Sequence, residues 1–386
     1  MHTFNTVARS VVGTGACAEL ATLLMGVAKG PASHVLLVSD AHLLQLGLLE
    51  PALKSLRKVG IEVTLFTEVV PDPPESLVLE CAAQAINAGV DTVVAIGGGS
   101  SMDLAKVVAV LAHPRCRQSI GELYGIDQVK GERLPLLLAP STAGTGSEVT
   151  PIAIITTGET TKAGIVAAQL YADMAILDPA LTASLPPAIC AVTGIDAMVH
   201  AIESYTSKIK KNPVSDQLAR GALTLLGANI ERACQPAPPE LVRENMLVGA
   251  MQAGQAFANA PVAAIHALAY PLGGHFHLSH GLTNALMLLP VLRFNLPDCV
   301  GLYAELARHL HLADSGSDAQ GAQALVDYIA GLLDRLQLPL RLREHGIEKS
   351  FLPTLVSDAM LQQRLLVNNP RQVSEQDALA LYREAW

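Results

Sequence analysis

The sequence contains few charged residues and few aromatic residues. Only 16% of its 386 residues are Asp, Glu, Lys or Arg, against roughly 25% in an average globular protein, whereas 50% are hydrophobic. A chain of this composition buries much of its surface, which excludes disorder and favours a homodimer or a larger homo-oligomer. The length exceeds what one hydrophobic core usually serves, so we expect two domains.

Positive charge is also scarce. The 26 basic residues are outnumbered by 35 acidic ones, and the formal net charge is -9. Because this charge repels phosphate backbones and anionic headgroups, we expect no nucleic acid or membrane partner. Aromatic residues make up 4% of the chain and its single Trp is the last residue, so no platform for base stacking is predicted.

Signals for export and for membrane insertion are lacking. The six cysteines form no C-x-x-C pair, and no basic segment followed by an apolar run opens the sequence, so we expect reduced thiols in a cytoplasmic protein. Residues 245–292 contain no Asp, Glu, Lys or Arg, but Gln, Asn, His, Pro and Gly interrupt every window long enough to span a bilayer. This stretch therefore predicts buried helices, and the histidines kept in it suggest a function for them.

Hydrophobic periodicity predicts an α/β domain followed by an all-helical domain. Apolar runs predict strands at 34–39, 62–66, 91–96 and 134–139, and helical spacing predicts helices at 43–58, 76–88 and 102–111. Strands that alternate with helices imply a parallel sheet covered on both faces. Beyond a boundary near residue 183, the pattern predicts helices at 186–207, 214–234, 239–258, 281–292, 301–309 and 320–336. We therefore expect domains at 1–183 and 184–386.

A glycine run suggests a phosphate site in the first domain. Gly97, Gly98, Gly99 and Ser100 follow a predicted strand and open a helix, where the backbone can approach an anion closely, although such a turn can also be only a tight connector. Asp40 ends an earlier strand. Its carboxylate can bind the adenosine ribose of NAD and repel the 2'-phosphate of NADP, or it can cap the next helix, and both roles can hold together.

A second group of residues has the types and spacing of a metal site. Asp196 and His200 lie four residues apart on one predicted helix face, a spacing that also suits an ordinary hydrogen-bonded pair. Four of the 12 histidines, including His266 and His280, lie within the uncharged stretch. Several buried imidazoles are costly unless a cation shares their lone pairs, and a carboxylate with three imidazoles suits Fe(II) or Zn(II) with one position open for an oxygen ligand.

Together these motifs resemble the iron-containing, or group III, alcohol dehydrogenase family over nearly the whole chain. The residues 97–106, 141–148, 194–203 and 265–281 carry the resemblance. It implies a Rossmann-like, dehydroquinate synthase-like first domain and an NAD-linked alcohol dehydrogenase that interconverts a small alcohol and its aldehyde or ketone by hydride transfer. It further implies metal ligation by Asp196, His200, His266 and His280, a pyrophosphate at residues 97–100, and a dinucleotide site lined by Asp40, Asp103, Thr142, Thr145 and Lys162. Phe257 would lie near the substrate.

The sequence departs from the family pattern at one position. Many members carry a histidine four residues after the third metal ligand, often assigned to proton relay, and here that residue is Tyr270. A phenol can pass a proton but buffers poorly near neutral pH, so Tyr270, His275 and His277 are all candidates for the relay. The alternative functions are a polyol-phosphate dehydrogenase or a dehydroquinate synthase-like lyase, a metal-free maleylacetate reductase-like enzyme, and a non-catalytic binding protein. The uncharged stretch argues against the phosphate-binding enzymes, and the complete ligand set against the maleylacetate reductases.

Overall fold

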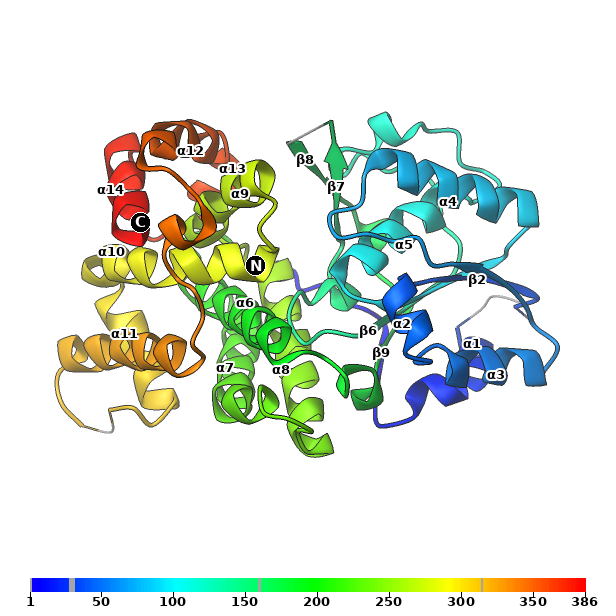
Figure 1. Ribbon diagram of the computed structural model, residues 1–386, viewed down its shortest axis with the longest axis horizontal. Helices are drawn as coiled ribbons and strands as arrows, with labels where there is room; N and C mark the ends of the chain where they lie inside the picture. The colour runs from blue at the N-terminus through cyan, green and yellow to red at the C-terminus, as the bar shows by residue number, and fades with distance from the viewer. Residues whose placement is uncertain (1, 28–31, 159–160, 314) are drawn as a thin grey trace. The chain divides into compact units, whose positions relative to one another are not determined.

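The computed structural model describes residues 2–27, 32–158, 161–313 and 315–386, and the chain divides into two compact units (Figure 1). One unit is Thr6–Leu185 and contains all of the strands described below. The other is Pro186–Trp386 together with the first few residues of the chain. All six cysteines are free thiols.

A six-stranded parallel sheet forms the centre of the first unit. Its strand order is β1-β9-β6-β4-β2-β3, and the strands are β1 (Arg9–Val12), β2 (His34–Val38), β3 (Glu62–Phe66), β4 (Thr92–Gly97), β6 (Leu136–Pro140) and β9 (Met174–Leu177). Every residue of β4, β6 and β9 is buried, which explains why these segments are continuous apolar runs. The predicted parallel sheet is confirmed.

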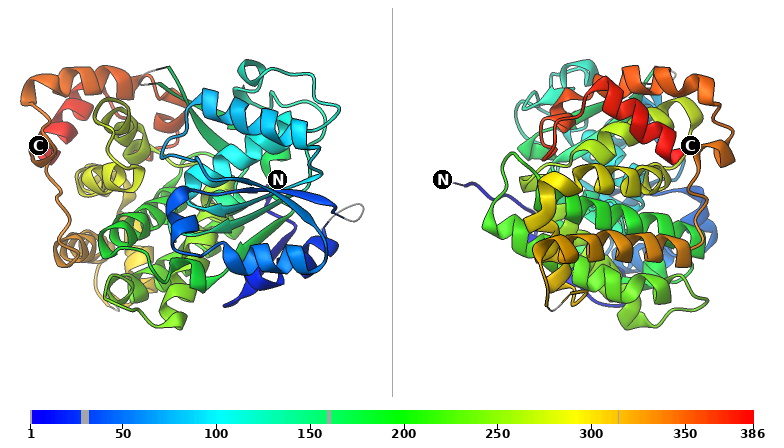
Figure 2. Two further views of the ribbon diagram at one scale, coloured as in Figure 1. Left: turned by 45° about the vertical axis from the view of Figure 1, so that its right-hand side comes forward. Right: turned by 90° about the vertical axis from the view of Figure 1, so that its left-hand side faces the viewer.

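Helices cover both faces of this sheet (Figure 2). They are α1 (Leu20–Met25), α2 (Ala41–Gln45), α3 (Glu50–Lys58), α4 (Glu75–Ala88) and α5 (Gly99–Leu111). The prediction of a single helix over residues 43–58 is wrong. Gly47 adopts a left-handed conformation with a φ of 70° and separates α2 from α3.

A smaller three-stranded sheet consists of one short strand before β6 and two strands after it. Its strands are β5 (Gly125–Ile126), β7 (Ile152–Thr157) and β8 (Thr161–Val166), in the order β5-β8-β7, with β7 and β8 antiparallel. The sequence analysis did not predict these strands. They are short or partly exposed, and their hydrophobic alternation is weak.

The second unit is helical throughout its described residues, as predicted. Its helices are α6 (Pro187–Thr206), α7 (Pro213–Ala233), α8 (Glu240–Asn259), α9 (Ala264–Phe276), α10 (His280–His309), α11 (Asp318–Arg335), α12 (Leu352–Met360), α13 (Gln363–Leu366) and α14 (Glu375–Ala385). Helix α6 packs against α7, α8 and α10, and α9 packs against α10 and α12. From Cys190 onward α6 is almost wholly buried, so its polar residues face other helices instead of water.

Helix α10 differs from its prediction. The expected helices 281–292 and 301–309 are parts of one continuous helix that contains Pro290 and Pro297. Among the described residues, α10 is the one helix long and apolar enough to cross a membrane, and half of its most apolar window is buried inside the structure. Since the core helices of globular proteins have the same properties, α10 is weak evidence for a membrane span.

Candidate metal centre and cofactor loop

Four side chains of the helical unit converge on one point. Asp196 and His200 project from α6, His266 from α9 and His280 from the first turn of α10, and their ligand atoms all lie within 4.8 Å of one another. We call these four residues the metal cluster. Asp196 Oδ1 is 3.8 Å from His200 Nε2 and 3.7 Å from His280 Nε2. Ligands on a tetrahedral cation with bonds of about 2.1 Å are about 3.4 Å apart, so small movements would let one ion bind all four.

The metal cluster is buried and carries one formal negative charge. Asp196, His200 and His266 are at most 3% exposed, and His280 is partly exposed. Burial by itself raises the pKa of Asp196, but the imidazoles of His200, His280 and His266 lower the pKa by more, so the net shift is downward. Asp196 is therefore held as a carboxylate, the form that binds a cation.

Aromatic stacking fixes the orientation of the His200 ring. The ring stacks on Phe257 of α8, with centroids 4.4 Å apart, and also on His266, with centroids 4.9 Å apart. Phe257 was expected near the substrate. The structure places it against a predicted metal ligand, and such contacts restrict the ring to one rotamer.

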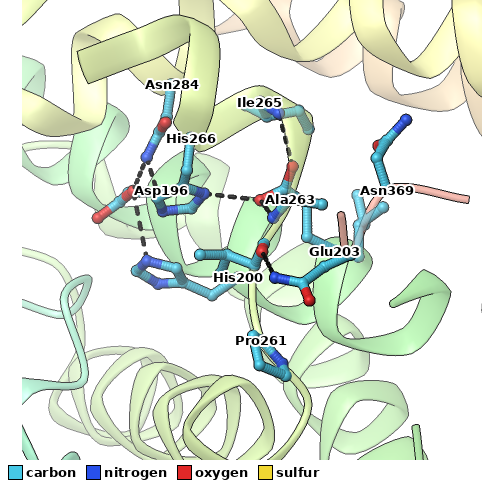
Figure 3. A network of polar contacts seen from close by, with 12 residues as sticks. Asp196, His200, Glu203, Pro261, Ala263, Ile265, His266, Asn284 and Asn369 are labelled. Atoms are coloured by element: carbon cyan, nitrogen blue, oxygen red, sulfur yellow. Dashed lines mark hydrogen bonds and ion pairs between the residues drawn. The ribbon is translucent and has the colours of Figure 1, made fainter. Parts of the chain in front are cut away.

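Asn284, one turn after His280 on α10, enters the metal cluster. Its Nδ2 donates a hydrogen bond to Asp196 Oδ1 at 2.6 Å and lies 3.2 Å from His266 Nε2 (Figure 3). The same Nδ2 lies 3.3 Å from His280 Nε2. Its buried Oδ1 has no hydrogen-bond partner among the described residues. The space between the ligands therefore holds a small polar group, and one carboxylate with three imidazoles matches the donor preferences of Fe(II) and Zn(II). The residues present fit the implied cation.

The three candidates for proton relay lie in different surroundings. The Tyr270 ring is 6.1 Å from the His280 ring, centroid to centroid, which places it beside the metal cluster. His275 Nε2 is 2.5 Å from Asp358 Oδ2 of α12, and its ring packs edge-on against Phe351. His277 ends α9 in a left-handed conformation with a φ of 53°. Of these contacts, the one made by Tyr270 is with a predicted metal ligand, His280.

The glycine run in the first unit permits close packing at the start of α5. A Cβ added at Gly97 would lie 2.4 Å from Ser101 Oγ, and one at Gly99 would lie 2.9 Å from Thr145 Cγ2. Gly97 therefore lets α5 begin directly after β4, and Gly99 lets Thr145 of the loop after β6 lie against the N-terminal end of α5. Thr142 belongs to this loop, and its buried Oγ1 has no hydrogen-bond partner among the described residues. A helix N-terminus beside an unpaired hydroxyl fits a pyrophosphate.

Asp103 and Lys106 brace the same loop from within α5. Asp103 accepts hydrogen bonds from Ser147 Oγ at 2.6 Å and from the Ile154 backbone at 2.9 Å, and the fully buried Lys106 donates to Ser147 Oγ at 2.7 Å. Burial lowers the pKa of Lys106 to about 8 and raises the pKa of Asp103 despite the nearby ammonium group. The bonds of Asp103 go to protein groups, so its contact with a dinucleotide stays a prediction.

The remaining cofactor candidates also have partners within the first unit. Asp40 caps α2, with Oδ1 accepting from the Leu43 backbone at 3.0 Å. Lys162 forms an ion pair with Asp72 at 2.7 Å, and the Asp72 backbone donates to Ser100 Oγ at 3.2 Å. Asp72 therefore connects Lys162 of β8 to the glycine run. The sequence analysis did not select Asp72, because no local spacing relates it to either residue.

Comparisons with known proteins cover almost the whole chain. The model of the "Fe-containing alcohol dehydrogenase family, C-terminal" matches residues 190–386, and that of "Iron-containing alcohol dehydrogenase" matches residues 8–179. Long-chain-alcohol dehydrogenase 1 of Geobacillus thermodenitrificans is 38% identical over 379 residues, which cover 98% of this chain and 95% of that protein.

Solved structures agree with these matches. A crystal structure of 1,3-propanediol oxidoreductase superimposes with a TM-score of 0.94 at 31% identity and covers all of both chains. Sulfoacetaldehyde reductase from Bifidobacterium kashiwanohense, solved in complex with NAD+, gives a TM-score of 0.89 at 27% identity, over 100% of this chain and 98% of the other.

Proposed function

The chain belongs to the iron-containing alcohol dehydrogenase family and is an alcohol oxidoreductase, and on this basis we propose that it interconverts an alcohol and its aldehyde or ketone with NAD and a divalent cation held by the metal cluster. The observation that carries the proposal is the convergence, within 4.8 Å, of four possible ligand atoms from three helices. Fe(II) is the cation that the family name suggests, and Zn(II) suits the same ligands.

Each bound group would supply one part of the chemistry. Asp196, His200, His266 and His280 would hold the cation, which would supply Lewis acidity toward the substrate oxygen, and NAD bound to the first unit would supply the hydride acceptor. The protein has to hold these groups, exclude water and move the proton. Asp196 provides the anionic ligand, and the stacked His200 and His266 rings present a fixed donor geometry.

We assign the proton transfer to Tyr270. Its ring lies beside His280, and its hydroxyl can receive the alcohol proton through a hydrogen bond and pass it on. His277 is the second candidate. It directly follows α9, the helix that carries Tyr270, and its own left-handed backbone conformation turns the chain toward α10. The bond of His275 to Asp358 assigns that side chain to packing against α12.

We propose that NAD binds on the first unit. The N-terminus of α5, with Gly98 and the neighbouring Thr142 hydroxyl, would hold the pyrophosphate. Asp40 caps α2 through Oδ1, so Oδ2 is the oxygen that would meet the adenosine ribose and disfavour a 2'-phosphate. Thr145 and Lys162 would line the same site.

A reconstitution assay tests the proposed function. Protein stripped with a chelator is loaded with Fe(II) or Zn(II) and mixed with a series of uncharged alcohols, while NADH and NADPH formation are followed in parallel. We expect NADH formation that depends on the added cation and disappears in an Asp196→Asn variant. Turnover by the stripped protein, or a clear preference for NADP, would contradict the assignment of the metal cluster or of Asp40, respectively. Light scattering tests the expected homodimer.

A further inference from the structure

Glu203 is a buried carboxylate that the proposed chemistry does not use. It lies on α6, seven residues after Asp196 and three after His200, so the helix places all three on one face. It is 3% exposed. A carboxylate rarely remains buried at this level unless other groups compensate its charge, so its partners indicate its role.

Among the described residues, the hydrogen-bond partners of the Glu203 carboxylate lie at the start of α9. Oε2 lies 2.7 Å from His266 Nδ1 and accepts from the Ala263 backbone at 2.9 Å, and Oε1 accepts from the Ile265 backbone at 2.6 Å (Figure 3). The carboxylate thus connects α6, which carries two residues of the metal cluster, to α9, which carries a third. It also lies at the positive end of α9, where an anion is stabilised.

The contact with Nδ1 determines which nitrogen of His266 faces the metal cluster as an acceptor. A carboxylate can only accept a hydrogen bond, so the imidazole proton resides on Nδ1 and the lone pair is left on Nε2. Nε2 is the atom that lies 3.2 Å from the Asn284 amide nitrogen inside the cluster. Glu203 therefore holds His266 in the tautomer that binds a cation through Nε2.

The charge of Glu203 also completes the site. One carboxylate and three neutral imidazoles leave a divalent cation with a net charge of +1, and residues 245–292, which carry His266 and His280, contain no charged side chain. When the Glu203 carboxylate is included, the net charge of the cation and these side chains is zero. A neutral buried centre avoids the cost of an uncompensated buried charge.

We propose that Glu203 is a positioning residue of the metal centre: its carboxylate fixes the tautomer and orientation of His266 and balances the charge of the bound cation. The inference rests on the proposed function, because it takes His266 as a metal ligand. The competing explanation is that Glu203 only caps the N-terminus of α9. A cap would contribute to folding stability and leave the cation affinity of the folded protein unchanged.

Glu203→Gln separates the two explanations. The amide has the same shape but one acceptor oxygen for three donors, and it removes the negative charge. Either a backbone N–H loses its partner, or His266 moves its proton to Nε2 and blocks the lone pair that faces the cluster. Outer carboxylate partners of metal-bound histidines typically contribute 10- to 100-fold in metal affinity, and we expect a loss of about this size.

Asp178→Asn is the matched control. Asp178 is also a buried carboxylate, 2% exposed, and accepts from the backbone of Gly15, Cys17 and Ala180, but it belongs to the first unit. This variant loses an acceptor and a charge in the same way. We expect it to lower stability while its cation affinity stays within about twofold of the parent protein.

The measurement is the dissociation constant for Co(II) and Zn(II), by competition with a chromophoric chelator, on full-length protein whose folding is checked by circular dichroism. The visible spectrum of the Co(II) protein reports the ligand field directly, and we expect it to change in E203Q alone. If E203Q does not fold, E203D withdraws the carboxylate from His266 by one methylene, and we expect reduced affinity there too.

The outcomes are distinct. Cation affinity and a Co(II) spectrum unchanged in a folded Glu203 variant, with or without a loss of stability, would overturn the inference and leave a cap. Failure of the parent protein to bind a cation, or an unchanged affinity in His266→Ala, would instead overturn the proposed function.

Discussion

Gly281 lets α10 approach α6 closely enough for His280 to join the metal cluster, and its replacement provides a quantitative test. A Cβ at this position would lie 2.4 Å from the Val192 carbonyl oxygen and 2.8 Å from the Val192 carbonyl carbon, both backbone atoms of α6. Because an ordinary contact begins near 3.4 Å, Gly281→Ala would force the helices apart locally by about 1 Å. A backbone cannot rotate away as a flexible side chain can, so α10 itself has to move.

The expected cost follows from two opposing terms. Overpacking of this kind destabilises proteins by about 1 to 3 kcal/mol, and exchange of glycine for alanine in a helix returns up to about 1 kcal/mol. We expect Gly281→Ala to lose about 1 to 2 kcal/mol in the free energy of unfolding. Since metal sites tolerate ligand displacements of only about 0.2 Å, displacement of the neighbouring His280 should also weaken cation binding by at least about tenfold.

Gly301→Ala is the control within the same helix. A Cβ there has no atom within 4 Å, so the exchange should stabilise the protein by about 0.5 to 1 kcal/mol and leave metal binding unchanged. Guanidinium unfolding of the metal-free variants followed by circular dichroism, together with chelator competition, measures both effects. If Gly281→Ala were as stable as Gly301→Ala and bound Co(II) like the parent protein, the close approach of α10 to α6 would not position His280.

Three further predictions concern other parts of the molecule. Burial raises the pKa of Glu148 from 4.5 to about 7, so the folded protein binds this proton more tightly than the unfolded chain; stability should fall as pH rises from about 4.5 to 7, and Glu148→Gln should flatten that profile in thermal unfolding. Thr142→Val removes an unpaired buried hydroxyl and should weaken NADH binding, measured by fluorescence titration, about 5- to 30-fold without loss of stability, whereas unchanged binding would remove Thr142 from the cofactor site. Tyr270→Phe should lower kcat about 100-fold in steady-state assays at unchanged Co(II) affinity, and an unaffected kcat would transfer the relay to His277.

The sequence was sufficient where local spacing decides the structure. The i, i+4 spacing of Asp196 and His200 and the cluster of histidines in an uncharged stretch indicated a metal site, and the family resemblance selected His266 and His280 from that cluster. These four side chains converge in the structure. The parallel sheet followed from strands whose residues are almost all apolar, because burial on both faces leaves that pattern directly in the sequence.

Tertiary packing decided the features that the sequence did not predict. The uncharged stretch was expected to form buried helices, but the bounds of α9 within it were not predicted, because Pro271 interrupts an almost entirely apolar segment that has no polar face to give a period. Helix α10 was predicted as two helices because Pro290 and Pro297 lie within it. Proline normally ends or kinks a helix, and here the surrounding helices keep α10 continuous.

The three helices of the metal cluster are held together by contacts of different kinds, and this explains why the convergence of its four side chains was easier to predict than the contacts that position them. Asp196 and His200 need only the regular repeat of α6. His266 needs Glu203 to bind the first turn of α9, and His280 needs the absence of a side chain at the next residue. A carboxylate seven residues after Asp196 and a glycine after a histidine are unremarkable as sequence, since each acquires its role from a partner on another helix. Variants of these supporting residues should therefore alter cation affinity while all four ligands remain present.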